Sequence, residues 1–460
     1  MPRFLFMQKP LPWLFALWFS PFVQAETLPE APGPFPISSQ MPSEPLPNPL
    51  SLEFLLQDFP LKSSRYFFAQ TQSDLAEAQA QSLSATNGLK LNFEGRLSRR
   101  EYSDEAQDHH QFALHLGKVL YDGKINQLRQ LNLLKVAEAQ KLEQAAELES
   151  YKLSVMQAFF AALLADFQYR IDNEAMAVEF IAFDKSKEQH SLSRLSDVDL
   201  LEAENRYQQT LLKRAKAEQN LLKMRVRLAN VIGYAEARPD KLVFPDLSHF
   251  DQRSIEELKL ESLQQQVEAN PMLVALRSQA EGQMQQIEAS HRLNQPQVRA
   301  DAWVGKLSSY PELREGRWRA DLSVEVPLYD AGVQRLETAK ERAKFKTLQA
   351  TYEQLAQSLR DEVTELYFQL QMLENERKAD LLFADFADLY LDFSRALYEN
   401  ESSTDLGDSM VRLSQANFNQ AEWQLRRAML WSQLDYLLGV PVRPFAQPIE
   451  AQQANLPQQP

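Results

Sequence analysis

Val119-Leu120-Tyr121-Asp122-Gly123 and Pro327-Leu328-Tyr329-Asp330-Ala331 stand 208 residues apart, each between strand-like alternating sequence and a long tract without proline. Matching stretches close the two tracts, 206 residues apart: Leu228-Ala229-Asn230-Val231-Ile232-Gly233 and Leu434-Asp435-Tyr436-Leu437-Leu438-Gly439. A nearly constant offset between two pairs of landmarks indicates an internal repeat. The chain is therefore predicted to use one unit twice, β-strands followed by a long helical hairpin.

The N-terminus has the pattern of a secretory signal peptide. Arg3 and Lys9 precede an apolar run over 11–23, and a small residue, Ala25, ends the segment. The run is shorter than the ~20 residues that a bilayer requires and contains prolines, which disfavours a retained anchor helix. We expect cleavage after Ala25.

Composition excludes several functional classes. There is no cysteine, so disulfides, thiolate metal sites, a cysteine nucleophile and a lipid-modified cysteine are excluded. The net charge of −14 argues against a nucleic-acid partner. No metalloprotease, serine-hydrolase, P-loop or dinucleotide motif is present, so we expect neither an enzyme nor a cofactor. Beyond the signal peptide no window of 18 apolar residues occurs, so the mature chain is either soluble outside the cytoplasm or crosses a membrane as β-strands.

Prolines mark the boundaries of the segments. Of 24 prolines, 13 lie within residues 1–60 and five lie from 441 onward, whereas 61–238 and 328–440 contain none. Because proline costs a helix interior about 3 kcal/mol, both proline-free tracts are predicted to be largely helical. The predicted map is a signal peptide (1–25), a proline-rich segment (26–50), a first repeat (51–240), a second repeat (241–440) and a Pro/Gln-rich tail (441–460).

Each repeat is predicted to contain a helix, a β-hairpin and two long antiparallel helices. Alternating apolar and polar residues indicate four strands with one apolar face. The first helix of each pair, about 70 residues, extends ~100 Å at 1.5 Å per residue. Along the second helix of each pair the apolar residues recur at a spacing of about 3.5 or 3.7, which predicts coiled-coil packing between the long antiparallel helices. The expected elements are a helix within 51–86, a hairpin at about 88–121, helices at about 122–190 and 197–232, a helix at about 252–292, a hairpin at about 297–328, and helices at about 330–399 and 405–438.

The four strands have the length and alternation of an outer-membrane barrel. Strands of ~10 residues, tilted by ~45°, match the barrel height, and aromatic side chains near the strand ends suit a girdle at the lipid interface. Strands packed on the protein's own helices are the alternative. Four strands leave two unpaired edges, which lipid does not tolerate, so copies of the chain must complete a barrel, and three copies supply 12 strands. The expected girdle residues are Trp303, Trp318, Tyr310, Tyr102 and Tyr121.

With these features the chain resembles TolC-type channels of the outer membrane efflux protein family. The matching motifs are the two Leu-Tyr-Asp openings, Ala269-Asn270-Pro271-Met272-Leu273, Ser196-Asp197-Val198 and the Leu-x-x-x-x-Gly ending of each return helix. The resemblance implies a homotrimer, with a 12-stranded β-barrel in the outer membrane and a 12-helix α-barrel across the periplasm. It also implies an exit duct that works with a periplasmic adaptor and an inner-membrane pump, in tripartite efflux or type I secretion.

The helical-hairpin turns are the expected gate and adaptor-docking sites. The resemblance places Asp405, Asp408 and Asp197 at a periplasmic constriction, where rings of carboxylates favour cations. Helix capping is the alternative role for Asp197 and Asp405. The residues expected to dock the adaptor are Ser191, Leu192, Ser196, Ser403 and Thr404.

The second turn departs from the family pattern. Residues 398–404 lack the usual glycine and basic residue, and Gly407 and Ser409 stand where larger apolar and alanine residues are commoner. This leaves open a non-conducting member of the family. A periplasmic adaptor or scaffold is a further alternative, but an adaptor carries a lipoyl-like β-module between its hairpin helices, whereas here the predicted strands lie outside them.

Two further polar groups have competing interpretations. Asp385, Asp388 and Asp392 share one helical face and either line the lumen or form its solvated side. Asp108, His109, His110 and His115 fall near a predicted hairpin tip, where a polar loop is an alternative to a metal site. We expect no metal.

Overall fold

The computed structural model describes residues 46–57, 64–86, 88–101, 106–108, 110–234, 237–308, 315–399 and 406–442, which belong to one compact unit. The predicted signal peptide and most of the proline-rich segment and the tail lie outside these ranges. So do Tyr102, His109, Tyr310, Ser403, Thr404 and Asp405.

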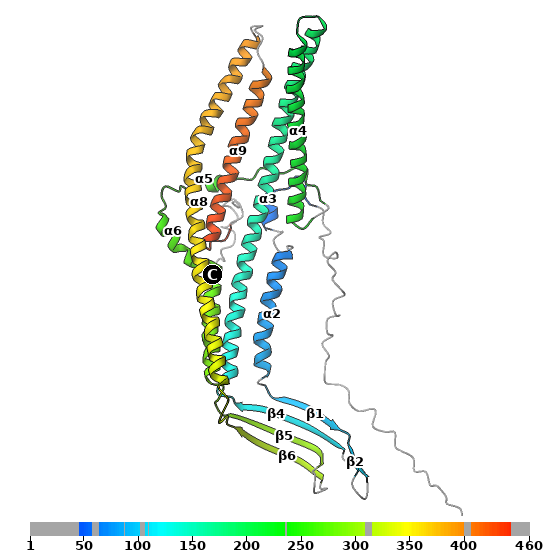
Figure 1. Cartoon of the computed structure of the whole chain (residues 1–460), viewed down its shortest axis with the longest axis vertical. Coiled ribbons are helices and arrows are strands. Elements are labelled where there is room, and N and C mark those ends of the chain that lie inside the picture. The colour runs from blue at the N-terminus through cyan, green and yellow to red at the C-terminus, as the bar shows by residue number, and fades with distance from the viewer. Residues whose placement is uncertain are drawn as a thin grey trace, which may run out of the picture. The chain divides into compact units, whose positions relative to one another are not determined.

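The described chain contains the same sequence of elements twice (Figure 1). The long helices α3 and α8 are both 67 residues long, as the duplicated sequence landmarks require. The first set is α2 (Ser64–Thr86), β1 (Lys90–Arg96), β4 (Gln111–Tyr121), α3 (Ile125–Ser191) and α4 (Asp197–Val231); the second is α7 (Pro271–His291), β5 (Gln297–Ser308), β6 (Glu315–Glu325), α8 (Val333–Glu399) and α9 (Leu406–Leu437). Shorter elements are α1 (Leu52–Gln57), β2 (Arg99–Glu101), β3 (Ala106–Asp108), α5 (Ser248–Asp251), α6 (Leu260–Gln266) and the 3-10 turn η2 (Val267–Ala269).

The aspartate of each Leu-Tyr-Asp motif builds the junction between strand and helix. Asp122 Oδ2 accepts a hydrogen bond from the Asn126 amide at 3.0 Å, and Asp330 Oδ2 accepts one from the Gln334 amide at 2.9 Å. The two residues after each aspartate have positive φ angles, 67° and 66° in the first junction and 53° and 84° in the second. Carboxylates at the start of a helix satisfy its free amides, which explains why the motif recurs.

The stretch 252–292, expected as one helix, is divided by Asn270 and Pro271. Asn270 is the N-cap of α7, and its side chain accepts a hydrogen bond from the Met272 amide at 2.9 Å. Pro271 occupies the first helical position, where its missing N–H costs nothing. The helix therefore begins at Pro271, after the short α6 and the 3-10 turn.

The helices pack as antiparallel neighbours: α3 with α4 and α8 with α9, and α7 lies between α3 and α8. The largest fully buried side chains include Trp431, Phe159, Met156 and Leu373. Both return helices end before a glycine with positive φ, 79° at Gly233 and 75° at Gly439, as predicted for their C-termini. No helix within the described ranges is long and apolar enough to span a membrane.

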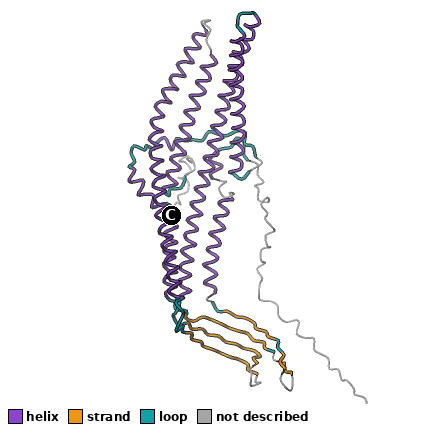
Figure 2. The backbone as a smooth tube through the Cα atoms, viewed as in Figure 1, coloured by secondary structure: helices purple, strands orange, loops and turns teal. Residues whose placement is uncertain are grey.

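The four longer strands form one antiparallel sheet in the order β1-β4-β5-β6. Figure 2 shows the strands together, at one end of the helices that follow them. β4 and β5 join the two repeats, whereas β1 and β6 each have one unpaired edge within the described part of the chain. Exposed apolar side chains such as Phe93, at 70% exposure, show that the described helices do not cover this sheet. The alternative of a sheet packed on the protein's own helices is therefore wrong for these residues.

Tyr151 gives the helical region a measurable sensitivity to alkali. Its buried hydroxyl donates to the Val231 carbonyl at 3.1 Å, and burial raises the pKa of Tyr151 to about 12. Because the pKa in the folded protein exceeds the unfolded value of about 10, this contribution is complete below pH ~10 and is lost as the pH rises toward 12. Between pH ~10 and ~12 we expect the free energy of unfolding, measured in urea, to fall by about 2 kcal/mol more in the wild type than in Tyr151→Phe. Tyr398→Phe removes an exposed tyrosine and should lose as much stability in alkali as the wild type. If the wild type and both variants lose equal stability, Tyr151 is not the cause of the alkaline sensitivity.

Candidate functional site

The sheet presents a largely apolar face that nothing else in the described chain covers, with Lys118 and Lys306 in register beside Ala300 and Phe112. Registered neighbours place Leu114 beside Val304, and Val304 beside Trp318. Trp318 is 73% exposed and Leu322 is 67% exposed. An exposed apolar patch of this kind marks a surface that binds a membrane, another protein or a ligand. The apolar face comprises Leu91, Phe93, Phe112, Leu114, Leu116, Val298, Ala300, Ala302, Val304, Trp318, Ala320, Leu322 and Val324.

The opposite face is polar and carries one of the expected girdle residues. Trp303 pairs in register with His115 and Arg319, and it stacks on the His115 ring with centroids 4.5 Å apart. Trp303 Nε1 donates to Glu94 Oε2 at 3.3 Å. These contacts hold Trp303 among charged groups on the polar face, so it does not lie on the apolar face with Trp318. Side chains alternate between the two faces along β5, so Trp303 lies on the same face as Arg299 and Asp301. Tyr121, at the end of β4, is half exposed and its hydroxyl lies 3.4 Å from Gln295 Oε1.

The first helical-hairpin turn is defined by local hydrogen bonds. Ser191 Oγ donates to the Glu188 carbonyl at 2.6 Å, and Leu192 is 57% exposed. The N-cap of α4 is Ser196, whose Oγ accepts from the Asp199 amide at 3.2 Å. Asp197 is therefore the first helical residue and is not the cap. Its carboxylate lies 2.6 Å from His190 Nε2 and remains 91% exposed on its side chain.

The described part of the second turn contains Asp408. Its Oδ2 lies 2.8 Å from Arg412 Nε, one helical turn along α9, and the Arg412 guanidinium lies over the Tyr390 ring, 5.1 Å from its centroid. The ion pair ties this carboxylate to α9 and offsets part of its charge. Asp405 lies outside the described residues, so the two expected constriction carboxylates are not seen together.

The acidic stripe and an apolar stripe occupy the distal part of α8. Asp385, Asp388 and Asp392 are all exposed. Phe386 and Leu389 lie between them in sequence and are also exposed, at 47% and 70%. The chain therefore leaves both polar and apolar surface of α8 uncovered at this level.

The histidines near the first hairpin do not form a metal centre in the described part of the chain. Asp108 ends β3, His110 precedes β4, and His115 lies within β4 between Glu94 and Asp301. Among the residues that the structure describes, no three His, Asp or Glu side chains are arranged to hold a metal ion.

No protein-family model and no curated protein matches the sequence. Solved structures do match. One match is CusC, whose structures describe conformational changes that accompany folding and transmembrane channel formation. It is 18% identical to this chain, with a TM-score of 0.69, and the match covers 85% of this chain and 92% of CusC. The outer membrane protein VceC of Vibrio cholerae has 14% identity and a TM-score of 0.67, over 85% and 97%. The MtrE outer membrane channel of Neisseria gonorrhoeae, in its open state, has 17% identity and a TM-score of 0.64, over 86% and 91%.

This chain has the fold of the outer-membrane channels. The resemblance to TolC-type channels that the sequence motifs indicate is thus confirmed at the level of the fold. The matches extend over nearly the whole described chain, so the sheet and both helical hairpins belong to one shared architecture.

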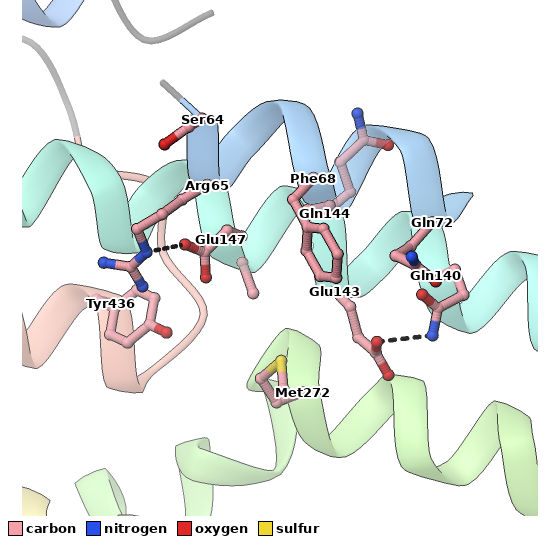
Figure 3. A pocket seen from close by; sticks show the side chains of 12 residues that line it. Ser64, Arg65, Phe68, Gln72, Gln140, Glu143, Gln144, Glu147, Met272 and Tyr436 are labelled. Carbon is pink, nitrogen blue, oxygen red and sulfur yellow. Dashed lines mark hydrogen bonds and ion pairs between the residues drawn. The ribbon is translucent and has the colours of Figure 1, made fainter. Parts of the chain in front are cut away.

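Within this channel fold, the structure contains an open cavity of about 550 Å³ between α2 and α3, lined by apolar as well as polar side chains, with Met272 and Tyr436 at its border (Figure 3). Arg65 Nε lies 2.7 Å from Glu147 Oε1 and links the two helices. Glu143 accepts hydrogen bonds from Gln140 and Gln279 at 2.7 and 2.9 Å. Burial raises the pKa of Glu143, and the two amide hydrogen bonds oppose that shift. These contacts join α2, α3 and α7, and the cavity contains no feature that singles out a ligand.

Sequence reasoning missed the grouping of Glu94, His115 and Asp301. The three residues come from different strands and lie up to 207 positions apart, so only the register of the sheet brings them together. The signal that could have pointed to them is the single histidine on the polar face of a predicted strand.

Proposed function

We propose that three copies of this chain form an exit duct that crosses the outer membrane and continues into the periplasm. The observation that carries the proposal is the uncovered sheet, apolar on one face, polar on the other and open at both edges. An open sheet edge is not tolerated in lipid, whereas closure by sister subunits removes it. Three four-stranded sheets make a 12-stranded barrel, which is wide enough for a water-filled lumen. The channel fold of the solved neighbours supports this assembly.

The dimensions of the elements suit this location. Strands of 11 or 12 residues rise ~3.3 Å per residue, and at a tilt of ~45° they span about 25 Å, the height of the apolar band of such barrels. Helices of 67 residues extend ~100 Å. Lipid would contact the apolar face, and the polar face would line the lumen.

The remaining exposed apolar surface has a place in the trimer. The stripe with Phe386 and Leu389 on α8 would pack on a neighbouring subunit, closing the helices into a 12-helix barrel. The turns around Leu192 and before Leu406 would form the periplasmic tip. A periplasmic adaptor would dock there and connect an inner-membrane pump, for efflux or type I secretion. The duct makes and breaks no bond, so no enzymatic role is proposed.

Conductance in planar bilayers tests the proposal. We expect detergent-purified protein to insert and conduct, with openings that increase when Asp405 and Asp408 are replaced by alanine. A protein that inserts as a trimer and never opens, even with both substitutions, would instead favour a non-conducting member of the fold. If the protein does not insert into the bilayer, the proposed function as a duct is wrong.

Neutralising the acidic residues of the tip should weaken cation preference. In the proposed trimer, Asp197 and Asp408 would contribute six carboxylates near one constriction, and such rings favour cations. We expect Asp197→Asn with Asp408→Asn to lower the cation-to-anion permeability ratio by about twofold or more, measured as reversal potential in a salt gradient. Glu261→Gln, an exposed acid of α6, is the control. Equal ratios in all three proteins would place these carboxylates away from the ion path.

A further inference from the structure

The helices next to the sheet pack in the order α2, α3, α7, α8, so the two repeats meet where α3 packs on α7 (Figure 1). In this repeat seam, Ser278 Oγ donates to the Lys135 carbonyl at 3.0 Å. Lys135 Nζ lies 2.9 Å from Glu138 Oε2 and 3.1 Å from Glu281 Oε2. The helices approach closely at Gly282, where a Cβ would lie 2.9 Å from Lys135 Cβ.

The duplication supplies an offset that maps the first repeat onto the second. The Leu-Tyr-Asp landmarks stand 208 residues apart, so α8 residues are numbered 208 higher than their equivalents in α3. Lys90 of β1 lies opposite Gly117, and Gln297 of β5 lies opposite Glu325, which is 208 residues after Gly117. Lys90 and Gln297 are therefore equivalent, and α7 residues are numbered 207 higher than their equivalents in α2.

One side of α2 is buried in the way that this mapping requires. Gln283 of α7 faces α8, because its Nε2 donates to Glu341 Oε2 at 2.6 Å. The equivalent of Gln283 in α2 is Ala76, which is only 6% exposed where α2 packs on α3. The pair of α2 and α3 is therefore built like the pair of α7 and α8.

A second side of α2 is uncovered in the described part of the chain. Ser278 and Gly282 lie on the side of α7 that packs on α3, and both are buried. Their equivalents in α2 are Thr71 and Leu75, which are both exposed. This side, with Thr71, Asp74 and Leu75, is called the α2 face below.

The matching side of α8 is uncovered as well. Ala139 of α3, one turn after Lys135, is fully buried, whereas its equivalent in α8, Thr347, is exposed. Ala343, the equivalent of Lys135, is also exposed. This side, with Ala343, Lys346 and Thr347, is called the α8 face below. One chain thus presents two uncovered faces that match the two faces joined in its own repeat seam.

The two uncovered faces carry opposite charges at matching positions. Asp74 is the equivalent of Glu281, and Lys346 is the equivalent of Glu138. In the repeat seam, Glu138 and Glu281 share the Lys135 ammonium, so these two positions are close in space. Neither Asp74 nor Lys346 has an ion-pair partner among the residues that the structure describes. An acid on one face and a lysine on the other would pair if the faces met.

Side-chain volumes are complementary too. In the repeat seam the long side chain of Lys135 lies against Gly282. Their equivalents reverse the sizes, because Ala343 is small and Leu75 is large. Contact of these two residues would fill the space between the helices without a clash, as close packing requires.

We propose that the α2 face of one chain packs on the α8 face of the next, with Leu75 against Ala343 and Asp74 paired with Lys346. The seam between subunits then reproduces the seam between repeats, and the two kinds alternate around the ring of helices. The proposal rests on the proposed function, which supplies the sister subunits.

Paired cysteines test the packing in a chain that has no cysteine of its own. In Leu75→Cys with Ala343→Cys, we expect mild oxidation of the full-length protein in detergent to give a covalent trimer on a denaturing gel, because Cβ atoms about 4 Å apart permit a disulfide. Leu75→Cys with Lys344→Cys is the matched control and should give little. Lys344 is adjacent to Ala343 but is paired with Glu341, at 2.9 Å, on another side of α8.

Native mass spectrometry of the same samples separates this proposal from the duct itself. A trimer that forms no covalent link in the first variant, or that links equally in both, would overturn the assigned faces and leave the duct standing. Single chains in both samples would overturn the two proposals together.

Charge reversal tests the ion pair. Asp74→Lys would bring two cations together, and we expect it to lower the temperature at which the trimer dissociates in detergent. Adding Lys346→Glu should recover much of the loss, because the pair is restored with its signs exchanged. Adding Lys378→Glu, an exposed lysine far along α8, makes the same change in charge and should recover nothing. Equal recovery with either second substitution, or none with Lys346→Glu, would overturn the pair.

Discussion

Leu322→Arg should abolish the stable insertion into the outer membrane that we propose for this protein. Leu322 lies within β6, on the apolar face, and is 67% exposed. If this face meets lipid, a guanidinium here costs about 2–4 kcal/mol per subunit, which a trimer incurs three times. Membrane fractionation and urea unfolding in lipid vesicles would measure the loss.

The adjacent residue supplies the matched control. Ser323 lies on the polar face, in register with Arg299. Ser323→Arg adds the same side chain one position away, where it would point into water, and we expect it to insert and to unfold within about 1 kcal/mol of the wild type. The account of the two faces is contradicted if both variants insert equally, or if Ser323→Arg is the more damaging.

Gly439→Ala should be the most destabilising of the single-methyl substitutions in the helical region. Gly439 has a φ of 75°, and a Cβ there would lie 2.5 Å from the Ala269 carbonyl oxygen. The left-handed conformation costs a non-glycine residue about 1–2 kcal/mol, and displacing a backbone carbonyl adds to this, for a total of about 2–4 kcal/mol. The contact joins the end of α9 to the start of the second repeat, so its loss should lower the midpoint of helix unfolding followed by circular dichroism.

Gly332→Ala separates the two contributions. Gly332 has a comparable φ of 84°, but a Cβ there would meet nothing within 4 Å. We expect this variant to lose only about 1 kcal/mol, from backbone strain alone. Similar losses in both variants would show that the close approach at Ala269 is relieved without cost.

The repeat architecture was predictable because its signals are local. The Leu-Tyr-Asp motifs cap the long helices through their own carboxylates, and the terminal glycines adopt left-handed angles that other residues resist. Each of these features depends on contacts with residues only a few positions away, so it can be predicted from the sequence. The break at Asn270 and Pro271 was visible too, yet the expectation of one helix over 252–292 gave too little weight to a proline at a helix start.

The candidate site was less accessible to sequence reasoning because it depends on strand register. Trp303 was expected in the aromatic girdle, although its parity places it on the polar face. His115 was considered with the hairpin-tip histidines, and only the pairing of β1, β4 and β5 shows that it lies between Glu94 and Asp301. At the first turn, Asp197 was a reasonable cap from the sequence, but it is the Ser196 side chain that accepts the hydrogen bond from the helix amide. The roles of Asp197, Asp408 and the acidic stripe in a gate stay predictions.

Native mass spectrometry of the detergent-extracted protein tests the central claim most directly. The unpaired edges of β1 and β6 and the uncovered apolar face require partners, and sister subunits are the proposed ones. We predict a particle of three identical chains that dissociates only when the sheet unfolds. A single chain that is stable and monodisperse in buffer without detergent would contradict the account.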